Sequence, residues 1–266
     1  YYNLPEAAIK DTLTLEIRDA AGNLVRSFSS VRDASYKRYD GAPAPDPVLS
    51  RSKGLNRFVW NMRTPTMPGV PNVYIESSYS GHKVPPGTYT LTLVAGTRKV
   101  SATGTILPNP LYPTDAATYQ QYHQVMSDME QKVMLMHNTV NRLNDKREQL
   151  EALLGKLPKG EQTAALQQKG AQLVKDLKAW DEEMVQRKSK AYDDVENFPN
   201  KFTANYLFLL NQTESDIPRV NQPNMDLKAK LDAQWSALQQ KAADLEQQLS
   251  AYNKQLWEAG VGAVCK

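Results

Sequence analysis

The sequence has almost no cysteine. Cys265, next to the last residue, is its only one, and one thiol can form neither an internal disulfide nor a cysteine-based metal cluster. No apolar run approaches the roughly 18 residues of a membrane-spanning helix, and no signal peptide is recognisable. The chain begins with Tyr1 rather than Met. We interpret this as a cut end, with the true N-terminus and any targeting signal upstream.

Charge of one sign is also scarce. The 32 Lys and Arg nearly balance the 29 Asp and Glu, for a net charge of +3. Residues 1–107 hold 13 basic and 8 acidic side chains, and residues 108–266 hold 19 and 21. Binding to a phosphate backbone needs a dense basic patch, which neither half has. The sequence therefore argues against nucleic acid as a partner.

A chain of 266 residues is long for one domain, and two domains are the natural expectation. Apolar residues make up 41% of it, enough for sizeable cores. The mean hydropathy of −0.58 nevertheless indicates much polar surface, as long helices with polar outer faces would give.

The first 107 residues have the pattern of β-structure. Leu13, Leu15 and Ile17 alternate with polar residues, which is typical of a half-buried strand. The turn formers of 19–23 then lead into a second strand at 24–28. Further strands are predicted at 56–60, 88–94 and 98–106. Several short strands in about 100 residues suggest a small β-sandwich over 1–107.

Residues 108–114 contain three prolines and are predicted to form a stiff linker. Long helices follow in 115–266, with apolar residues spaced alternately three and four apart. They are expected at 115–154, 162–192 and 224–259, with a short one at 200–212. Predicted caps are Thr114 and Asn224, with Gly155 as a stop. The expected fold class is therefore α+β, a sandwich followed by an antiparallel long-helix bundle.

The helical seams could pair within one chain or between two. The link at 155–161 is short enough to force antiparallel neighbours, and the apolar residues within 193–223 can cover the open side. Seam breaks at Arg147 and Arg187 would lie near helix ends, where a guanidinium reaches water. We therefore predict a monomer with Trp180 and Trp235 buried in the seam.

No cofactor site, metal site or catalytic constellation is recognisable. His123 and His137 lie roughly 21 Å apart along one helix, so they cannot share a metal and are expected on a solvated face. His82 reads as a lone loop histidine. The acidic residues at 193–196 lack calcium-loop spacing and read as a solvated helix end. The sequence favours a fragment that is not an enzyme, without cofactors.

Two aromatic groups are open to more than one interpretation. Trp60 ends an alternating strand on the side of Phe58, which favours a core position over a sugar platform. Tyr74, Tyr79 and His82 lie in a loop rich in Pro, Gly and Ser. They are the best candidates for an exposed ligand surface, because aromatic rings stack on sugars. The methionines of the first helix, Met126, Met129 and Met136, are assigned to the bundle core.

Three segments, in this order, carry a resemblance to a known family. They are Leu15-Glu16-Ile17-Arg18-Asp19-Ala20-Ala21-Gly22-Asn23-Leu24-Val25-Arg26, Gly54-Leu55-Asn56-Arg57-Phe58-Val59-Trp60-Asn61-Met62-Arg63 and Val84-Pro85-Pro86-Gly87-Thr88-Tyr89. The chain resembles the C-terminal region of bacterial sortilin-like (VPS10-type), BNR-repeat glycosyl hydrolase proteins. In that family a large β-propeller precedes a sandwich similar to the Ig-like domain of flagellar hook-capping proteins, and helices follow.

The resemblance covers nearly the whole chain but departs from the family at two places. Asn61 and Met62 replace the usual Asp-Leu between Trp60 and Arg63, and Pro108-Asn109-Pro110 stands where Asp-Pro-Arg is common after the last strand. No Asp-box occurs, so the propeller blades, and any sialidase-like chemistry, lie outside this sequence.

The resemblance implies an accessory module of a secreted, periplasmic or cell-surface bacterial protein. Its partner would be the upstream propeller of the same parent chain. Two alternatives stay open. The fragment is a carbohydrate- or protein-binding module in its own right, or a glycosidase with its site at the junction of sandwich and bundle.

Overall fold

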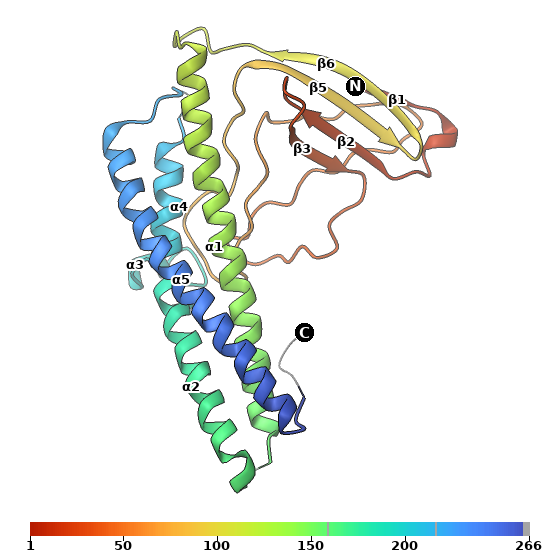
Figure 1. The fold of residues 1–266 in the computed structure, drawn as a ribbon. Coiled ribbons are helices and arrows are strands. Elements are labelled where there is room, and N and C mark those ends of the chain that lie inside the picture. Colours follow the sequence, from red (N-terminus) through yellow and green to blue (C-terminus); the bar gives the residue numbers. More distant parts are fainter. Residues whose placement is uncertain (159, 216, 263–266) are drawn as a thin grey trace.

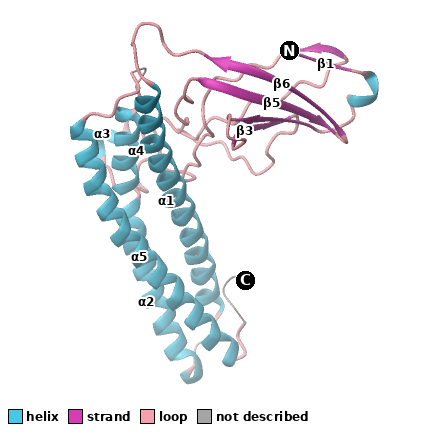
Figure 2. Ribbon diagram, turned by 45° about the horizontal axis from the view of Figure 1, so that its top comes forward, coloured by secondary structure: helices cyan, strands magenta, loops and turns pink. Residues whose placement is uncertain are grey.

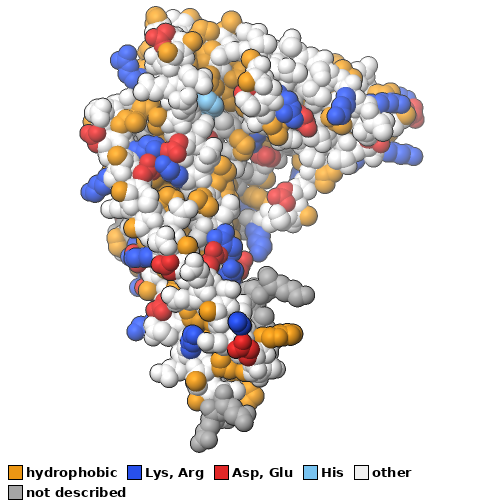
Figure 3. Space-filling model, in the orientation of Figure 1, with side chains coloured by type: hydrophobic (Ala, Val, Ile, Leu, Met, Phe, Trp, Pro, Cys, Tyr) orange, Lys and Arg blue, Asp and Glu red, His pale blue; other side chains and the backbone are white. Residues whose placement is uncertain are grey.

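The computed structural model describes residues 1–158, 160–215 and 217–262. The fold is α+β, with two antiparallel sheets followed by long helices. The sheets lie beside one end of the helices, next to the start of the first helix (Figures 1 and 2). Lys and Arg are interspersed with Asp and Glu over the face drawn in Figure 3.

The larger sheet has the strand order β3-β2-β5-β6, and the smaller one pairs β1 with β4. The predicted hairpin of β2 and β3, at one side of the larger sheet, is confirmed: Gly22 takes a positive φ of 84°, and Asp19 Oδ1 accepts a hydrogen bond from Asn23 N at 2.8 Å. The strand bounds are β1 Tyr2–Leu4, β2 Leu13–Arg18, β3 Leu24–Ser29, β4 Gly54–Asn56, β5 Gly87–Ala95 and β6 Arg98–Ile106.

The strand predicted at 56–60 is wrong, because β4 ends at Asn56. The Asn56 amide donates to the carbonyls of Ser52 and Gly54 at 2.7 and 2.9 Å, which fixes a local turn. Phe58 and Trp60 still pack on the sheet core. Phe58 lies 4.7 Å from the ring of Phe28, and Trp60, half-buried, meets Tyr89 edge to face at 5.8 Å.

Except for the end of the second helix, the helices start and end close to the predicted positions. Asp115 rather than Thr114 caps the first helix, accepting from Thr118 N at 2.7 Å. Asn221 rather than Asn224 caps the last one. The second helix is shorter than predicted, so Arg187 lies beyond it, bonded to Asp181 at 2.7 Å. The helix bounds are α1 Ala116–Lys156, α2 Glu161–Met184, α3 Asp194–Asn197, α4 Phe202–Thr213 and α5 Gln222–Glu258; a 3-10 turn spans Glu6–Ala8.

The long helices α1 and α5 run the length of the bundle, and α2 and α4 follow one another along it (Figure 1). Trp180 and Trp235 are buried, as predicted, with 2% and 3% of their surface exposed. The seam residues of α1 are buried as well, and they are Tyr122, Met126, Met129, Val133, Met136, Val140, Leu143 and Leu150.

The described residues form two hydrophobic cores, and the boundary between these cores does not fall at residues 108–114. One lies between the sheets, around Leu13, Ile17 and Phe28. The other fills the bundle, but it also contains five residues from before the linker, which are Met67, Val70, Val73, Ile75 and Tyr79. The division into domains 1–107 and 115–266 stays a prediction. Among the described residues, no helix is long and apolar enough to cross a membrane.

Candidate functional site

The most unusual feature of the molecule is an extended loop that leaves the sheets and enters the bundle. We call residues 62–84 the arm. Its two sides run antiparallel: Val84 N donates to Met62 O at 2.8 Å, and Met67 N donates to Tyr79 O at 2.8 Å. Between them Arg63 forms an isolated bridge with Lys83. The arm is therefore a hairpin-like strap with its tip at residues 68–78.

The tip of the arm is bound by side chains of the helices. On α1, His137 Nδ1 donates to Pro68 O at 2.6 Å, and Asn141 donates to Gly69 O at 3.0 Å. On α4, the Asn211 amide bonds both N and O of Ser78, at 2.6 and 3.0 Å. Backbone groups of the arm that leave the sheets thus find partners in the bundle, as buried polar groups require.

The base of the arm carries a buried chain of ionisable side chains. Glu130 of α1 accepts three hydrogen bonds: from the backbone N of His82 at 2.6 Å, from His82 Nδ1 at 2.8 Å and from the hydroxyl of Thr64 at 2.9 Å. On its other side, His82 Nε2 lies 2.7 Å from Nδ1 of His123. His82 is fully buried and Glu130 is 5% exposed. We call His82, His123 and Glu130 the junction cluster.

The hydrogen bonds of the junction cluster determine which ring nitrogen of His82 carries a proton. Nδ1 of His82 must carry a proton to donate to the carboxylate, so Nε2 is left to accept from His123. Burial, followed by the electrostatic interaction with neighbouring His82, lowers the pKa of His123 below its ordinary value. His123 is therefore neutral near pH 7. The arrangement orients imidazoles, but the histidines engage each other rather than a hydroxyl or thiol nucleophile.

The polar network continues from the arm to the sheet and to the end of α4. Arg26 of β3 is buried, pairs with Asp46 and donates to Thr64 O at 2.9 Å. Arg63 donates to Gly81 O at 2.6 Å and pairs with Glu214 at 2.5 Å. Sheet, arm and bundle are thus joined by one set of hydrogen bonds.

The residues predicted to form an exposed aromatic ligand surface are largely covered in the structure. Tyr79 is 4% exposed and His82 is fully buried, while Tyr74 is only half-buried and contacts Tyr192 edge to face at 6.4 Å. A loop rich in Pro and Gly reads as solvent-exposed, but this one is covered by helices. The expectation of solvated histidines fails for the same reason, since the arm packs over His137 and half-covers His123.

One sequence signal could have revealed the cluster. His123, Glu130 and His137 are spaced seven residues apart on α1. Residues at that spacing share one helix face, and this row directly follows the seam residues Tyr122, Met129 and Met136. Polar side chains that repeat along the flank of an apolar seam indicate a second contact surface. The surface that meets them is the arm.

Hollows of the surface lie both beside this junction and away from it. A cavity of about 190 Å³ lies between the Pro85-Pro86 turn, the end of β6 and the start of α1, where Tyr119, Tyr122 and Ser215 line it. Burial raises the pKa of Tyr122 to about 12, so its hydroxyl stays protonated, and it accepts from Ser215 N at 3.1 Å. The cavity is mostly apolar and holds no converging set of charged groups.

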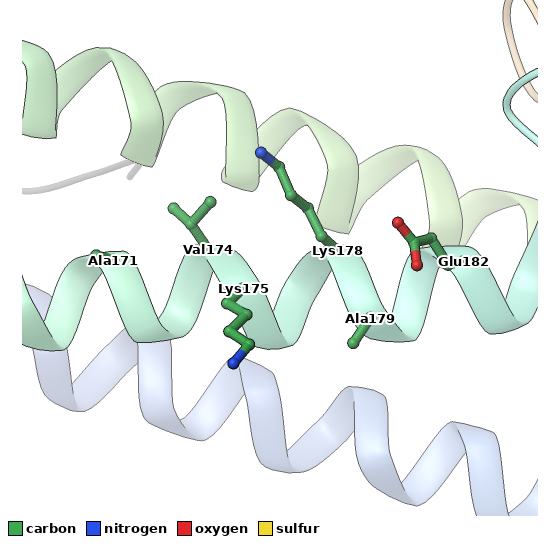
Figure 4. Close-up of a pocket in the computed structure, with 6 residues that line it drawn as sticks. All are labelled: Ala171, Val174, Lys175, Lys178, Ala179 and Glu182. Atoms are coloured by element: carbon green, nitrogen blue, oxygen red, sulfur yellow. The ribbon is translucent and has the colours of Figure 1, made fainter.

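The second hollow is an open groove along α2. Figure 4 shows its lining, with Lys175 and Lys178 pointing to opposite sides of the helix, toward different neighbouring helices. Lys178 pairs with Glu151 of α1 at 2.6 Å. All six lining residues come from one helix, so the groove brings together no groups from different elements. They are Ala171, Val174, Lys175, Lys178, Ala179 and Glu182.

Across residues 1–158, 160–215 and 217–262, no group of three or more His, Cys, Asp or Glu is placed to hold a metal ion. The acidic residues of 193–196 lie at α3, where Asp194 accepts from the backbone N of Lys190 and Ala191. No family model matches the sequence, and neither the curated proteins nor the solved structures contain a match.

Proposed function

We propose that this chain is a non-catalytic accessory module that holds its β-sheets and its helical bundle at a fixed orientation. The observation that carries the proposal is the arm, which starts and ends in the sheet region but buries its apolar side chains in the bundle core. A module of this kind positions whatever is attached to its two parts, or docks a partner at a set distance.

Energetics support this role. Val70 and Val73 are 0% and 1% exposed, and Met67 is 1% exposed. Burial of one such side chain stabilises by about 1.5–3 kcal/mol, so withdrawing the arm from the bundle would cost several such contributions. The buried hydrogen bonds of the junction cluster would be broken as well. The sheets and the bundle are therefore expected to move as one body.

The resemblance described above supports a more specific proposal. In it, the two sheets are a small Ig-like sandwich, and the chain is the C-terminal part of a secreted or envelope β-propeller protein, beside whose propeller the sandwich packs. Export from the cytoplasm belongs to this proposal. Cell fractionation with an antibody against the chain tests it, since a purely cytoplasmic signal would contradict it.

Rigidity can be measured directly with spin labels. In a Cys265→Ser background, Leu24→Cys on β3 and Leu227→Cys on α5 place labels at exposed positions on the two parts. We expect one narrow distance distribution. In the arm variant Val73→Asp the distribution should broaden, whereas Val59→Asp, at an exposed position, should leave it narrow. A broad distribution in the parent protein would contradict a fixed orientation.

Catalysis is tested with the same protein. Assays against a panel of aryl glycosides and sialosides should show no turnover above buffer. Turnover that is abolished by Glu130→Gln, with folding retained by circular dichroism, would assign a hydrolytic role to the junction cluster instead. The glycan-binding alternative loses its original basis, because Tyr79 and His82 are buried.

A further inference from the structure

Strand β6 lies along one margin of the larger sheet (Figure 1), and in the described part of the chain no strand pairs with its outer edge. It is nine residues long, and every residue from Arg98 to Thr105 is exposed. The opposite margin differs. Strand β3 has six residues, and the backbone N of Leu49 donates to Ser29 O at 2.9 Å on its outer side.

The hairpin between β5 and β6 determines which backbone groups of β6 point outward. Ala95 pairs with Arg98 across the two-residue turn Gly96-Thr97, and Gly96 has a φ of 57°. This is the geometry of a II′ turn, in which the closing pair is hydrogen-bonded. Hydrogen-bonded pairs alternate along an antiparallel ladder. The N–H and C=O groups that face solvent therefore belong to the odd-numbered residues, Lys99, Ser101, Thr103 and Thr105.

This edge lacks the features that usually prevent strands from pairing with other chains. Such features are prolines, bulges and charges along the strand. β6 contains no proline, its register with β5 is continuous over nine pairs, and its charges are confined to Arg98 and Lys99 at one end. The free edge is thus long, regular and neutral over most of its length.

The edge is also complementary to itself. Two copies can pair antiparallel about a two-fold axis at Ala102, which places Ser101 opposite Thr103 and Lys99 opposite Thr105 of the other copy. Every outward N–H and C=O then finds a partner, for about eight backbone hydrogen bonds. No like charges face each other, because the basic residues lie at opposite ends of the paired strands.

The side chains fit this arrangement on both faces of the sheet. Ser101 and Thr103 would meet as hydroxyl pairs on the polar face, as Thr92 and Ser101 already do within the chain at 2.9 Å. On the other face, Val100 is 70% exposed beside Leu93. In this register Val100 faces Gly104 of the other copy, and the two Ala102 side chains meet next to it on the same face.

We propose that the outer edge of β6 is a homodimer interface, through which two copies of this chain form one continuous eight-stranded sheet centred on Ala102. The monomer expected from the sequence considered only the helical seams. Those seams are closed within one chain, with Trp235 and Tyr252 buried, so the dimer interface lies in the sheet and leaves the helices free.

Sedimentation equilibrium from low to high micromolar concentration tests the proposal. We expect a reversible shift from 29.9 kDa towards twice that mass. A monomer throughout this range would overturn the interface.

Two charge variants test the register. Ala102→Lys and Ala102→Glu each place like charges directly opposite at the two-fold axis, and each should raise the Kd at least about tenfold. Mixing the two variants should restore a one-to-one heterodimer. Ala179→Lys, on the exposed face of α2, is the matched control and should dimerise like the parent. A dimer that is unaffected by both Ala102 variants would place the contact elsewhere.

A third variant tests the backbone contacts alone. Thr103→Pro removes an outward N–H but none of the bonds to β5, and proline is tolerated at such edge positions. We expect a folded monomer, judged by circular dichroism and sedimentation together. A folded Thr103→Pro protein that dimerises as tightly as the parent would refute pairing through this edge.

Discussion

The helical bundle and the larger sheet bury their apolar side chains to different degrees. In α1, one continuous row of seam residues is nearly inaccessible, from Tyr122 to Leu150. In the sheet, Leu13 and Ile17 are fully buried, but Leu91 and Leu93 of β5 are only half-buried, and Val100 is exposed. Burial thus declines from the middle of the sheet towards β6.

The difference follows from what covers each element. Each of the long helices α1, α2 and α5 packs against at least two other helices, and the arm covers the side of the bundle next to α1. The sheet is covered on its apolar face by two three-residue strands and loops, which cannot reach all four strands. The bundle is therefore expected to provide most of the stability, and the sheet to expose surface for contacts.

The largest expected effect lies in the bundle. Trp235 is 3% exposed and stacks on Phe202 with ring centroids 6.3 Å apart. Trp235→Ala should lower the free energy of unfolding by about 3–5 kcal/mol, measured by urea denaturation. Trp257 lies on the same helix but is 74% exposed, so Trp257→Ala should change stability by no more than about 0.5 kcal/mol. Equal losses in the two variants would contradict a closed seam.

Removing the acceptor of the junction cluster should cost nearly as much. Glu130→Ala removes the acceptor of the backbone N and of Nδ1 of His82, which is fully buried, and each buried donor left without a partner costs about 1–3 kcal/mol. We expect a loss of about 3 kcal/mol in total. Glu182→Ala, at an exposed position of α2, is the control. If Glu130→Ala is as stable as the control, the arm does not depend on this cluster.

Acid should weaken the contact between arm and bundle before it affects the ion pairs. Burial lowers the pKa of His137 to about 4, and the pKa of His123 is lowered too. The unfolded chain, with histidine near pKa 6.5, then binds protons more readily than the folded one. The contribution of the neutral histidines to the free energy of unfolding is therefore fully present above about pH 6.5. It falls as the pH is lowered towards 4, by about 3 kcal/mol for His137 alone.

Carboxylates with lowered pKa, such as Asp128 and Asp232, contribute stability that is lost only as pH falls below their unfolded value of about 4. Above pH 4.5, the change of the unfolding free energy with pH is therefore due to the histidines. His137→Asn keeps a donor for Pro68 O but cannot titrate. The slope of unfolding free energy against pH between 4.5 and 6.5 should be shallower in this variant. An unchanged slope would show that His137 is not the group being protonated.

A smaller effect is expected where α4 meets α5. The hydroxyl of Tyr206 donates to Asp232 at 2.7 Å, and Asp232 also pairs with Lys132 and Lys228 at 2.8 and 2.7 Å. Tyr206→Phe removes one hydrogen bond to a carboxylate that keeps two cations. We expect a loss of about 1 kcal/mol in urea denaturation. Tyr192→Phe, at a residue 60% exposed, should be neutral.

These contrasts also explain what the sequence could predict. The helices were predictable because their seam repeats every three or four residues. The hairpin of β2 and β3 was predictable because its alternation and its turn agree. The caps were misplaced because Thr114 and Asp115, or Asn221 and Asn224, are equally suitable residue types. Only the final backbone hydrogen bonds distinguish between them.

The arm was not predictable by the same reasoning. Met67, Val70, Val73 and Ile75 follow neither period, and their partners lie far away in the sequence; His137, for example, bonds Pro68 across 69 positions. In addition, the prolines and glycines of the segment are typical of an exposed loop, which is what the sequence predicted. The spacing of His123, Glu130 and His137 was the one local sign of this contact, and it identifies a face of α1 without identifying what covers it.

The smallest effect is expected at Val100 of β6, and it is best judged against the same substitution in the bundle. Val133 in the α1 seam is fully buried, whereas Val100 on β6 is 70% exposed. Val133→Ala removes two buried carbon atoms and should cost about 1.5–3 kcal/mol. Val100→Ala removes atoms that water already reaches, so its cost should stay near about 0.5 kcal/mol and reflect mainly strand propensity. Both are measured by urea denaturation at concentrations where the chain is monomeric. A loss at Val100 as large as that at Val133 would mean that another part of the molecule covers β6, and the contrast between a closed bundle and an open sheet would not hold.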